Sequence, residues 1–157
     1  MLFENVAACD ATLHVHDDRW WMFVSIRDDG FRGSDELFLF YAGGPLGPWT
    51  AHPRNPIKSD VRSARPAGRL FYRGDRLIRP AQDCSETYGG ALLLCEVLEL
   101  TPTSYREAVV KRLGPGWLTG NRGFHTLSFS KRLEVIDGKL DLPRWRARAH
   151  QWLDLGS

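Results

Sequence analysis

The chain has 157 residues, of which 43% are hydrophobic and 25% are charged, and its formal net charge is +2. This length suits one domain with its own core, and the composition is that of an ordinary globular protein. A charge so close to zero argues against a nucleic-acid-binding protein, and no apolar stretch approaches the ~20 residues of a membrane span. The N-terminal residues do not form a signal peptide, so we expect a cytoplasmic protein if the chain is complete.

The three cysteines, Cys9, Cys84 and Cys95, are odd in number and lack the spacing of a metal-binding pair. We therefore expect them to be reduced and buried. His14 and His16 lie two residues apart, on one face of a predicted strand, but no third ligand accompanies them. The sequence thus predicts neither a metal site nor a cofactor.

Short strands joined by short turns fill the first third of the chain. β-Branched and aromatic residues mark the strands, and Trp20 and Trp21 must point to opposite faces because side chains alternate along a strand. Gly, Pro and Asp mark the breaks. In chain order we expect a strand at 12–15, a turn at 16–19, a strand at 20–26, a loop at 28–35, a strand at 37–42, a break at 43–49 and an edge strand at 50–52.

The same order of elements begins again near residue 65. An Arg-Gly-Asp turn at 73–75 joins the first two strands of this second cycle into a hairpin. The last segment of the cycle could be a capped helix, but its adjacent valines, Val109 and Val110, favour a strand. The first expected strand is 66–72, and the second opens at 76–78. The third and fourth are 90–97 and 105–112.

A third cycle starts after residue 116. It has predicted strands at 124–129 and 133–136, followed by an Asp-Gly turn at 137–138. In the tail, 143–155, aromatic and aliphatic residues recur at roughly helical spacing. This tail is therefore either a helix or an irregularly packed strand.

The first strands of the three cycles begin near Asp10, Arg65 and His125, about 55 and about 60 residues apart. A four-stranded meander repeated every ~40–60 residues is typical of a β-propeller blade. We therefore predict an all-β fold, a partial β-propeller of about two and a half four-stranded antiparallel blades in one domain. A compact sandwich or barrel is the alternative. The blades would span roughly residues 9–57, 63–113 and 122–157.

Propellers close with about four to eight blades, so this chain cannot close one alone. A partial propeller exposes strand edges and apolar blade faces, which associate readily. We therefore expect either upstream blades in a longer protein or a homo-oligomer.

Three segments, 10–23, 44–49 and 65–71, resemble blades of five-bladed furanosidase-type propellers, the arabinanase-, xylosidase- and invertase-like glycoside hydrolases. A closer resemblance, over roughly residues 5–138, is to the propeller domain at the N-terminus of plant glucosamine inositolphosphorylceramide transferase and its bacterial relatives. That family has the motifs Arg-Pro-Ala-Gly, Arg-Pro-Ala-Gln-Asp-Cys with Tyr-Gly behind it, and Gly-x-His-Thr, in this order. Here these motifs lie at residues 65–68, 79–89 and 123–126.

The resemblance implies five blades in a whole domain, of which this chain supplies only the later ones. The blade that opens with the catalytic-base aspartate of the furanosidase type would lie upstream. The resemblance also implies a carbohydrate-active domain, glycoside hydrolase-like or glycosyltransferase-associated, which binds a sugar or sugar phosphate in a central funnel. A non-catalytic module that binds a glycan or a partner is the alternative, and whether the chain is an enzyme stays open.

In a propeller the innermost strand of each blade starts at the central funnel, so the three strand starts would meet there. The expected substrate-binding residues are Arg65, Arg79, Gln82, Tyr88 and His125. Tyr88 or Trp117 could form an aromatic platform for a sugar ring. His125 could bind a metal, as in some furanosidase-type relatives, or orient a carboxylate, or be a buried polar group.

Glycoside hydrolysis needs two carboxylates that flank the scissile bond. Asp10 and Asp83 are the catalytic candidates, and Glu96 is a weaker one because it lies inside an apolar strand. Each has a structural alternative. Asp10 could cap a turn, Asp83 could pair with Arg65 or Arg79 in a buried network, and Glu96 could be exposed or paired with an arginine.

Overall fold

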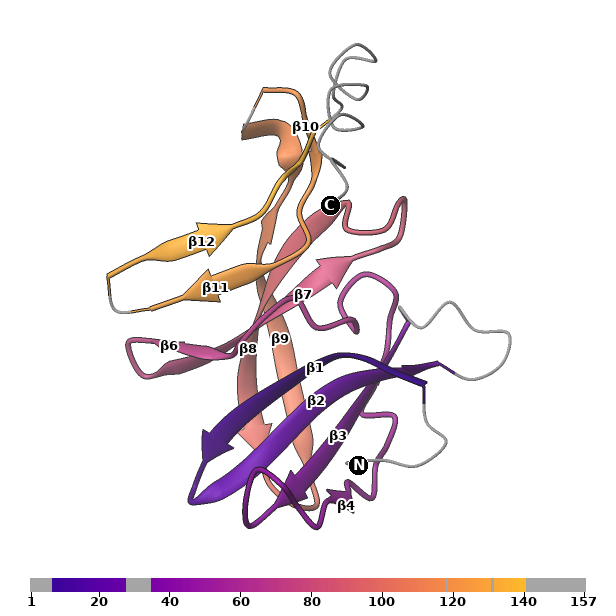
Figure 1. The fold of residues 1–157 in the computed structure, drawn as a ribbon, viewed down its shortest axis with the longest axis vertical. Helices are drawn as coiled ribbons and strands as arrows, with labels where there is room; N and C mark the ends of the chain where they lie inside the picture. Colours follow the sequence, from indigo (N-terminus) through magenta and orange to yellow (C-terminus); the bar gives the residue numbers. More distant parts are fainter. Residues whose placement is uncertain (1–6, 28–34, 118, 131, 141–157) are drawn as a thin grey trace, which may run out of the picture.

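The structure, a computed structural model of the chain, describes residues 7–27, 35–117, 119–130 and 132–140 (Figure 1). The strands are β1 (Ala7–His16), β2 (Arg19–Arg27), β3 (Glu36–Ala42), β4 (Thr50–Ala51), β5 (Lys58–Ser59), β6 (Phe71–Arg73), β7 (Arg76–Asp83), β8 (Ala91–Leu100), β9 (Tyr105–Leu113), β10 (Asn121–Gly123), β11 (Leu127–Phe129), β12 (Glu134–Ile136) and β13 (Lys139–Leu140). A short 3-10 helix, η1, spans Pro115–Trp117. Within these ranges no helix is long and apolar enough to cross a membrane.

Two antiparallel meanders make up most of the described chain. The first sheet has the order β1-β2-β3-β4, with β5 added to β3, and the second has the order β6-β7-β8-β9. In a third unit β11 pairs with β12, and β10 pairs with β13. No described sheet closes into a barrel. The fold is therefore all-β and matches a partial propeller, as predicted, while the exact blade boundaries stay a prediction.

One strand from each unit lies in a row, with β6 of the second unit between β1 of the first and β11 of the third (Figure 1). Two contacts fix this order. Nδ1 of His16, at the end of β1, lies 3.1 Å from the Tyr72 hydroxyl on β6. The rings of Phe71 on β6 and Phe129 on β11 stack with centroids 4.7 Å apart. Successive inner strands of propeller blades have this arrangement.

The predicted strand at 66–72 is mostly not a strand. Only its end lies in β6, while Pro66 forms an isolated bridge to Ala81 on β7. Two residues interrupt the ladder, because Pro66 has no N–H to donate and Gly68 has a φ of 122°. That φ and the contact with the third unit both require glycine, since a Cβ at Gly68 would overlap the carbonyl oxygen of Leu127.

Other predicted elements have mixed outcomes. Segment 105–112 is strand β9 and not a helix, in line with its two valines. The predicted strand at 124–129 is regular only in β11, because the backbone N–H of Phe124 bonds to Gly89 of the second unit and those of His125 and Thr126 bond to the Asp137 side chain. The tail at 143–155 lies outside the described residues.

The apolar core is built between the sheets. On β2, Trp21 and Phe23 are buried and face Leu77 and Tyr105 of the second sheet. Trp20, which points the other way, is half-buried, as strand alternation predicts. A second cluster joins the second sheet to the third unit, through residues that include Phe71, Ile78, Leu92, Phe124 and Leu127. Each unit is therefore packed on the next.

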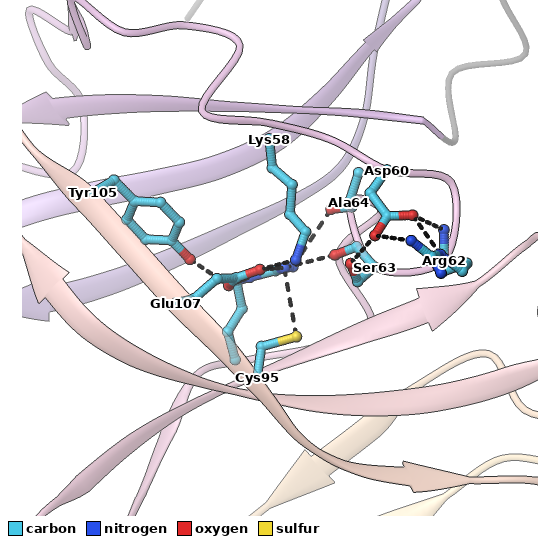
Figure 2. A network of polar contacts seen from close by, with 9 residues as sticks. Lys58, Asp60, Arg62, Ser63, Ala64, Cys95, Tyr105 and Glu107 are labelled. Atoms are coloured by element: carbon cyan, nitrogen blue, oxygen red, sulfur yellow. Dashed lines mark hydrogen bonds and ion pairs between the residues drawn. The ribbon is translucent and has the colours of Figure 1, made fainter.

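A buried ionic network lies beside the first core cluster (Figure 2). The Arg79 guanidinium, which is fully buried, donates from Nε and a terminal nitrogen to the two carboxylate oxygens of Glu107, each 2.7 Å away. Lys58 Nζ and the Tyr105 hydroxyl donate to the same carboxylate, both at 2.5 Å. Arg79 also donates to the backbone oxygen of Ser63 at 2.6 Å. The network thus ties the segment after the first sheet to β7 and β9.

Charge compensation decides the protonation of this network. Burial alone would raise the pKa of Glu107, but Arg79 and Lys58 hold it at about 2. Burial alone would lower the pKa of Arg79, and Glu107 raises it instead. Both groups are therefore charged in the folded chain, and each is the counter-ion of the other.

The three cysteines, all within the described residues, form no disulfide with one another, and only one is fully buried. Cys95 lies inside β8, and burial raises the pKa of its thiol to about 11. Cys9 and Cys84 are half-buried, which corrects the expectation that all three are buried. The reason is position, because Cys9 lies beside an irregularity in β1 and Cys84 follows the last residue of β7.

Candidate functional site

Asp10 lies where β1 departs from regular pairing. The register of β1 against β2 shifts between Cys9 and Thr12, and Asp10 has a φ of 55°, in the left-handed region. Bulges of this kind redirect a side chain, and non-glycine residues with positive φ cluster at functional sites. Here the bulge directs the Asp10 carboxylate towards the second unit.

Arg65 receives that carboxylate. Its Nε donates to Oδ2 of Asp10 at 2.6 Å, and the Arg65 side chain is only 5% exposed. Gln82 on β7 also reaches Oδ2 of Asp10, at 3.4 Å, and donates to the backbone oxygen of Pro66 at 3.0 Å. Burial alone would lower the pKa of the Arg65 guanidinium, but the Asp10 carboxylate more than offsets this and raises it. The buried Arg65 guanidinium is therefore charged and has Asp10 as its counter-ion.

Tyr88 covers Arg65 on the outer side. The guanidinium carbon of Arg65 lies 4.7 Å from the centroid of the Tyr88 ring, a cation–π distance. The Tyr88 hydroxyl is hydrogen-bonded with Nε2 of His125, and the two ring centroids are 5.0 Å apart. Tyr88 is 46% exposed and the His125 side chain is 41% exposed. Ring surface is thus available to a ligand.

His125 is held by the third unit. Its backbone N–H and that of Thr126 both donate to Oδ1 of Asp137, each at 2.7 Å. The backbone N–H of Phe124 donates to the carbonyl oxygen of Gly89 at 2.8 Å, which places His125 next to Tyr88. Asp10, Arg65, Gln82, Tyr88 and His125 are called the Tyr88 cluster below.

The structure thus brings together residues from the starts of all three cycles. Asp10 precedes most of β1, Arg65 opens the second cycle and His125 opens the third, and direct contacts link them through Tyr88. Gln82 joins them from β7. Five of the seven residues that the sequence proposed for the site therefore form one group.

Arg79 and Asp83 lie outside this group of contacts. The Arg79 donors are engaged inside the core by Glu107 and Ser63, as described above. Asp83 was expected to pair with Arg65 or Arg79, and this pairing is wrong. Its Oδ2 accepts from Nε of Arg112 at 3.1 Å and its Oδ1 accepts from the Ser85 hydroxyl at 2.6 Å.

The pairing of Asp83 sets its charge. Burial alone would raise the pKa of Asp83, but the hydrogen bonds from Ser85 and the ion pair with Arg112 lower it. A general acid needs a raised pKa, so the lowered pKa of Asp83 does not suit that role.

Glu96, the weaker catalytic candidate, pairs with Arg76, with Nε and Oε2 3.2 Å apart, so its structural alternative is the one observed.

Two further sequence candidates lie elsewhere. His14 and His16 stack near the opposite end of β1, with ring centroids 6.4 Å apart, and His16 contacts Tyr72. The Trp117 side chain lies outside the described part of the structure. Among the described residues no group of three or more His, Cys, Asp or Glu side chains could hold a metal ion.

Sequence reasoning missed the residues that support the cluster. Asp137 was predicted only as part of a turn, and nothing local indicates that it accepts N–H groups 11 and 12 residues earlier in the chain. Arg112 and Ser85 were not proposed as partners of Asp83. An Asp-x-Ser sequence is a recognisable signal for the Ser85 contact, because Asp side chains bond the residue two positions on.

The family model and the related proteins that match this chain point to the same family. The family model described as "Glucosamine inositolphosphorylceramide transferase 1, N-terminal" matches residues 3–119. Glucosamine inositolphosphorylceramide transferase 1 of Oryza sativa subsp. japonica is 41% identical over 104 residues, which cover 64% of this chain and 14% of the rice protein. The Arabidopsis thaliana protein of the same name is 32% identical over 142 residues, which cover 82% of this chain and 19% of that protein. The chain therefore spans less than a fifth of the length of these relatives, and no solved structure matches it.

Proposed function

Since this chain belongs to the family of glucosamine inositolphosphorylceramide transferase 1 N-terminal domains, we propose that it is a glycan-binding propeller module associated with a glycosyltransferase. The Tyr88 cluster is the proposed binding site, and its ligand is a sugar or a sugar phosphate. The relatives are named as transferases of this type, which supports a glycan-related role.

The convergence of three distant segments carries the proposal. A solvent-accessible tyrosine ring, backed by a buried arginine–aspartate pair, gives an apolar face with polar groups at its edge. Sugar rings are recognised by such combinations, because their C–H faces pack on aromatic rings while hydroxyls make directed hydrogen bonds. His125 supplies a further polar ring at this edge, and Gln82, which is only 1% exposed, supports the Asp10 carboxylate from the interior.

The state of the carboxylates favours binding over hydrolysis. Retaining and inverting glycosidases need one carboxyl that is protonated at the working pH and a second that is ionised. Asp10 and Asp83 are each held in a separate arginine ion pair. Such pairs stabilise the ionised form, so neither carboxyl is prepared to donate a proton to a leaving group.

Completion of the propeller is part of the same proposal. The described strands form two four-stranded sheets and a smaller third unit, whereas a closed propeller needs more blades. The much greater length of the relatives supports blades from a longer chain. A second copy of the chain is the other source, and a five-bladed total follows from the family resemblance.

Binding can be tested with the full chain and small probes. Ligand-observed NMR and titration calorimetry would be carried out with myo-inositol, glucosamine and glucose 1-phosphate. We expect at least one probe to bind, and Tyr88→Ala to weaken that binding by about tenfold, which corresponds to ~1.4 kcal/mol, the upper range for an aromatic contact.

Tyr72→Ala is the matched control. Tyr72 is 48% exposed against 46% for Tyr88, but it lies on β6 and contacts His16 outside the Tyr88 cluster. We expect this variant to bind the probe as the unaltered chain does. Equal losses in both variants, or no binding of any probe, would contradict the proposed function.

A further inference from the structure

Asp137 supports the Tyr88 cluster with both of its carboxylate oxygens. Oδ1 accepts the backbone N–H groups of His125 and Thr126, each at 2.7 Å. Oδ2 lies 3.8 Å from Nδ1 of His125. This carboxylate comes from the turn between β12 and β13, so it faces the imidazole from the third unit.

The two ring nitrogens of His125 have different surroundings. Nδ1 lies 3.2 Å from the Thr126 hydroxyl oxygen and faces the Asp137 carboxylate, whereas Nε2 faces the Tyr88 hydroxyl. A neutral imidazole carries one N–H, and a nearby carboxylate favours that N–H on the nitrogen that faces it. With the N–H on Nδ1, Nε2 can only accept. The Tyr88 hydroxyl must then donate to it.

We propose that Asp137 is a positioning residue that fixes His125 as the Nδ1–H tautomer, so that Tyr88 donates to His125 and presents only oxygen lone pairs to a ligand. The ligand group at this oxygen is then a hydrogen-bond donor, such as a sugar hydroxyl. A phosphate group, whose oxygens are strong acceptors, would face a second acceptor there. The inference rests on the proposed function and deepens it, because it assigns the hydroxyl-bearing ring of a sugar phosphate to the Tyr88 position.

A second partly exposed side chain of the cluster is also a hydrogen-bond acceptor, and the main donor of the cluster is covered. The Asp10 carboxylate, 29% exposed, is a second acceptor within the cluster. Arg65, which is the strong donor of the group, has a side chain that is only 5% exposed and lies beneath the Tyr88 ring. Within the cluster, the partly exposed side chains of Tyr88 and Asp10 therefore offer acceptors, which suit a ligand with several hydroxyl groups.

The tautomer can be measured directly in the ligand-free full chain. Two-bond ¹H–¹⁵N correlation spectra at about pH 8 distinguish a protonated from an unprotonated imidazole nitrogen. We expect Nδ1 of His125 to carry the proton. In Asp137→Asn the amide oxygen can still accept the two backbone N–H groups, but the amide NH₂ faces Nδ1 and donates to it. We therefore expect the proton to move to Nε2.

Asp75→Asn is the control, because it removes the same charge from the β6–β7 turn, at the other end of β7 from the cluster. We expect it to leave the His125 tautomer unchanged. A proton on Nε2 in the unaltered chain, or an unchanged tautomer in Asp137→Asn, would overturn the assignment. This result does not depend on any ligand, so it is separate from the fate of the proposed function.

The ligand preference is tested with two probes, myo-inositol, which offers hydroxyls alone, and inorganic phosphate. We expect myo-inositol to shift the Tyr88 ring signals of the unaltered chain several times more than phosphate does, and to do so less in Asp137→Asn. Phosphate shifts that equal those of myo-inositol would overturn the assigned polarity. Failure of the Tyr88→Ala binding test above would instead count against the proposed function alone.

Discussion

Replacement of Glu107 by alanine is expected to destabilise the chain by ~3–5 kcal/mol, the usual cost of removing one partner of a buried ion pair. Arg79 is fully buried and directs two of its donors at this carboxylate, so the variant leaves a guanidinium in the core without its counter-ion. Lys58 and Tyr105 lose the same acceptor. Urea unfolding at about pH 7 gives the difference in unfolding free energy.

Glu99→Ala is the matched control. Glu99 also pairs with an arginine across β8 and β9, but its partner Arg106 is 65% exposed and the Nε–Oε2 distance is 3.8 Å. Exposed pairs of this kind contribute about 1 kcal/mol or less. A Glu107→Ala effect as small as that of Glu99→Ala would show that the network does not hold β7, β9 and the segment after the first sheet together.

The pH dependence of this effect has a definite sign. The pKa of Glu107 is about 2 in the folded chain and lies near its ordinary value of 4.5 when unfolded. Its contribution is therefore complete above about pH 4.5 and is lost as the pH falls towards 2. We expect the stability gap between the unaltered chain and Glu107→Ala to shrink from about pH 5 to about pH 3. A constant gap would contradict the ionised network.

Replacement of Gly68 by alanine is expected to cost roughly 3 kcal/mol or more, because the position combines backbone strain with a steric clash. Gly68 has a φ of 122°, which side-chain-bearing residues rarely adopt, and its new Cβ would overlap the carbonyl oxygen of Leu127. The hydrogen bond from the Leu127 N–H to Ala67, 2.8 Å in the folded chain, would be lost or distorted. Thermal unfolding measures the loss of stability, and amide exchange of β11 measures the weakening of this hydrogen bond.

Gly74→Ala separates the clash from the backbone effect. Gly74 also has a positive φ, 62°, but no atom lies within 4 Å of an added Cβ. We expect a cost of ~1–2 kcal/mol from the left-handed conformation alone. Gly68→Ala should also loosen His125 and disturb its contact with Tyr88, while Gly74→Ala should not. Equal effects of the two variants would mean that the third unit does not depend on this close approach.

The repeated order of elements was enough to predict where the three cycles meet. Asp10, Arg65 and His125 share no motif, and only their common position at the start of a cycle indicated that they lie together. Strand periodicity predicts such positions well because side-chain direction alternates regularly. It could not predict the bulge at Asp10, which gives the carboxylate its direction towards Arg65.

The buried ionic network could not be predicted from residue type. On β9 the apolar residue Val109 is 51% exposed, whereas the Glu107 side chain, two residues earlier, is 4% exposed. Hydrophobic patterning gives the opposite expectation. Pairing of β9 with β8 shifts register twice, and the counter-ion Arg79 comes from a strand 28 residues away. Such partners are set by tertiary packing, which also explains why Asp83 pairs with Arg112.

Chemical-shift mapping of the full, isotope-labelled chain during titration with myo-inositol tests the central claim most directly. If the starts of the three cycles form one ligand site, the largest shifts will fall together on Asp10, Arg65, Tyr88 and His125. Residues at the opposite end of the inner strands, such as His16 and Tyr72, will then stay unchanged. Shifts confined to that opposite end, or spread over one sheet alone, would contradict the claim.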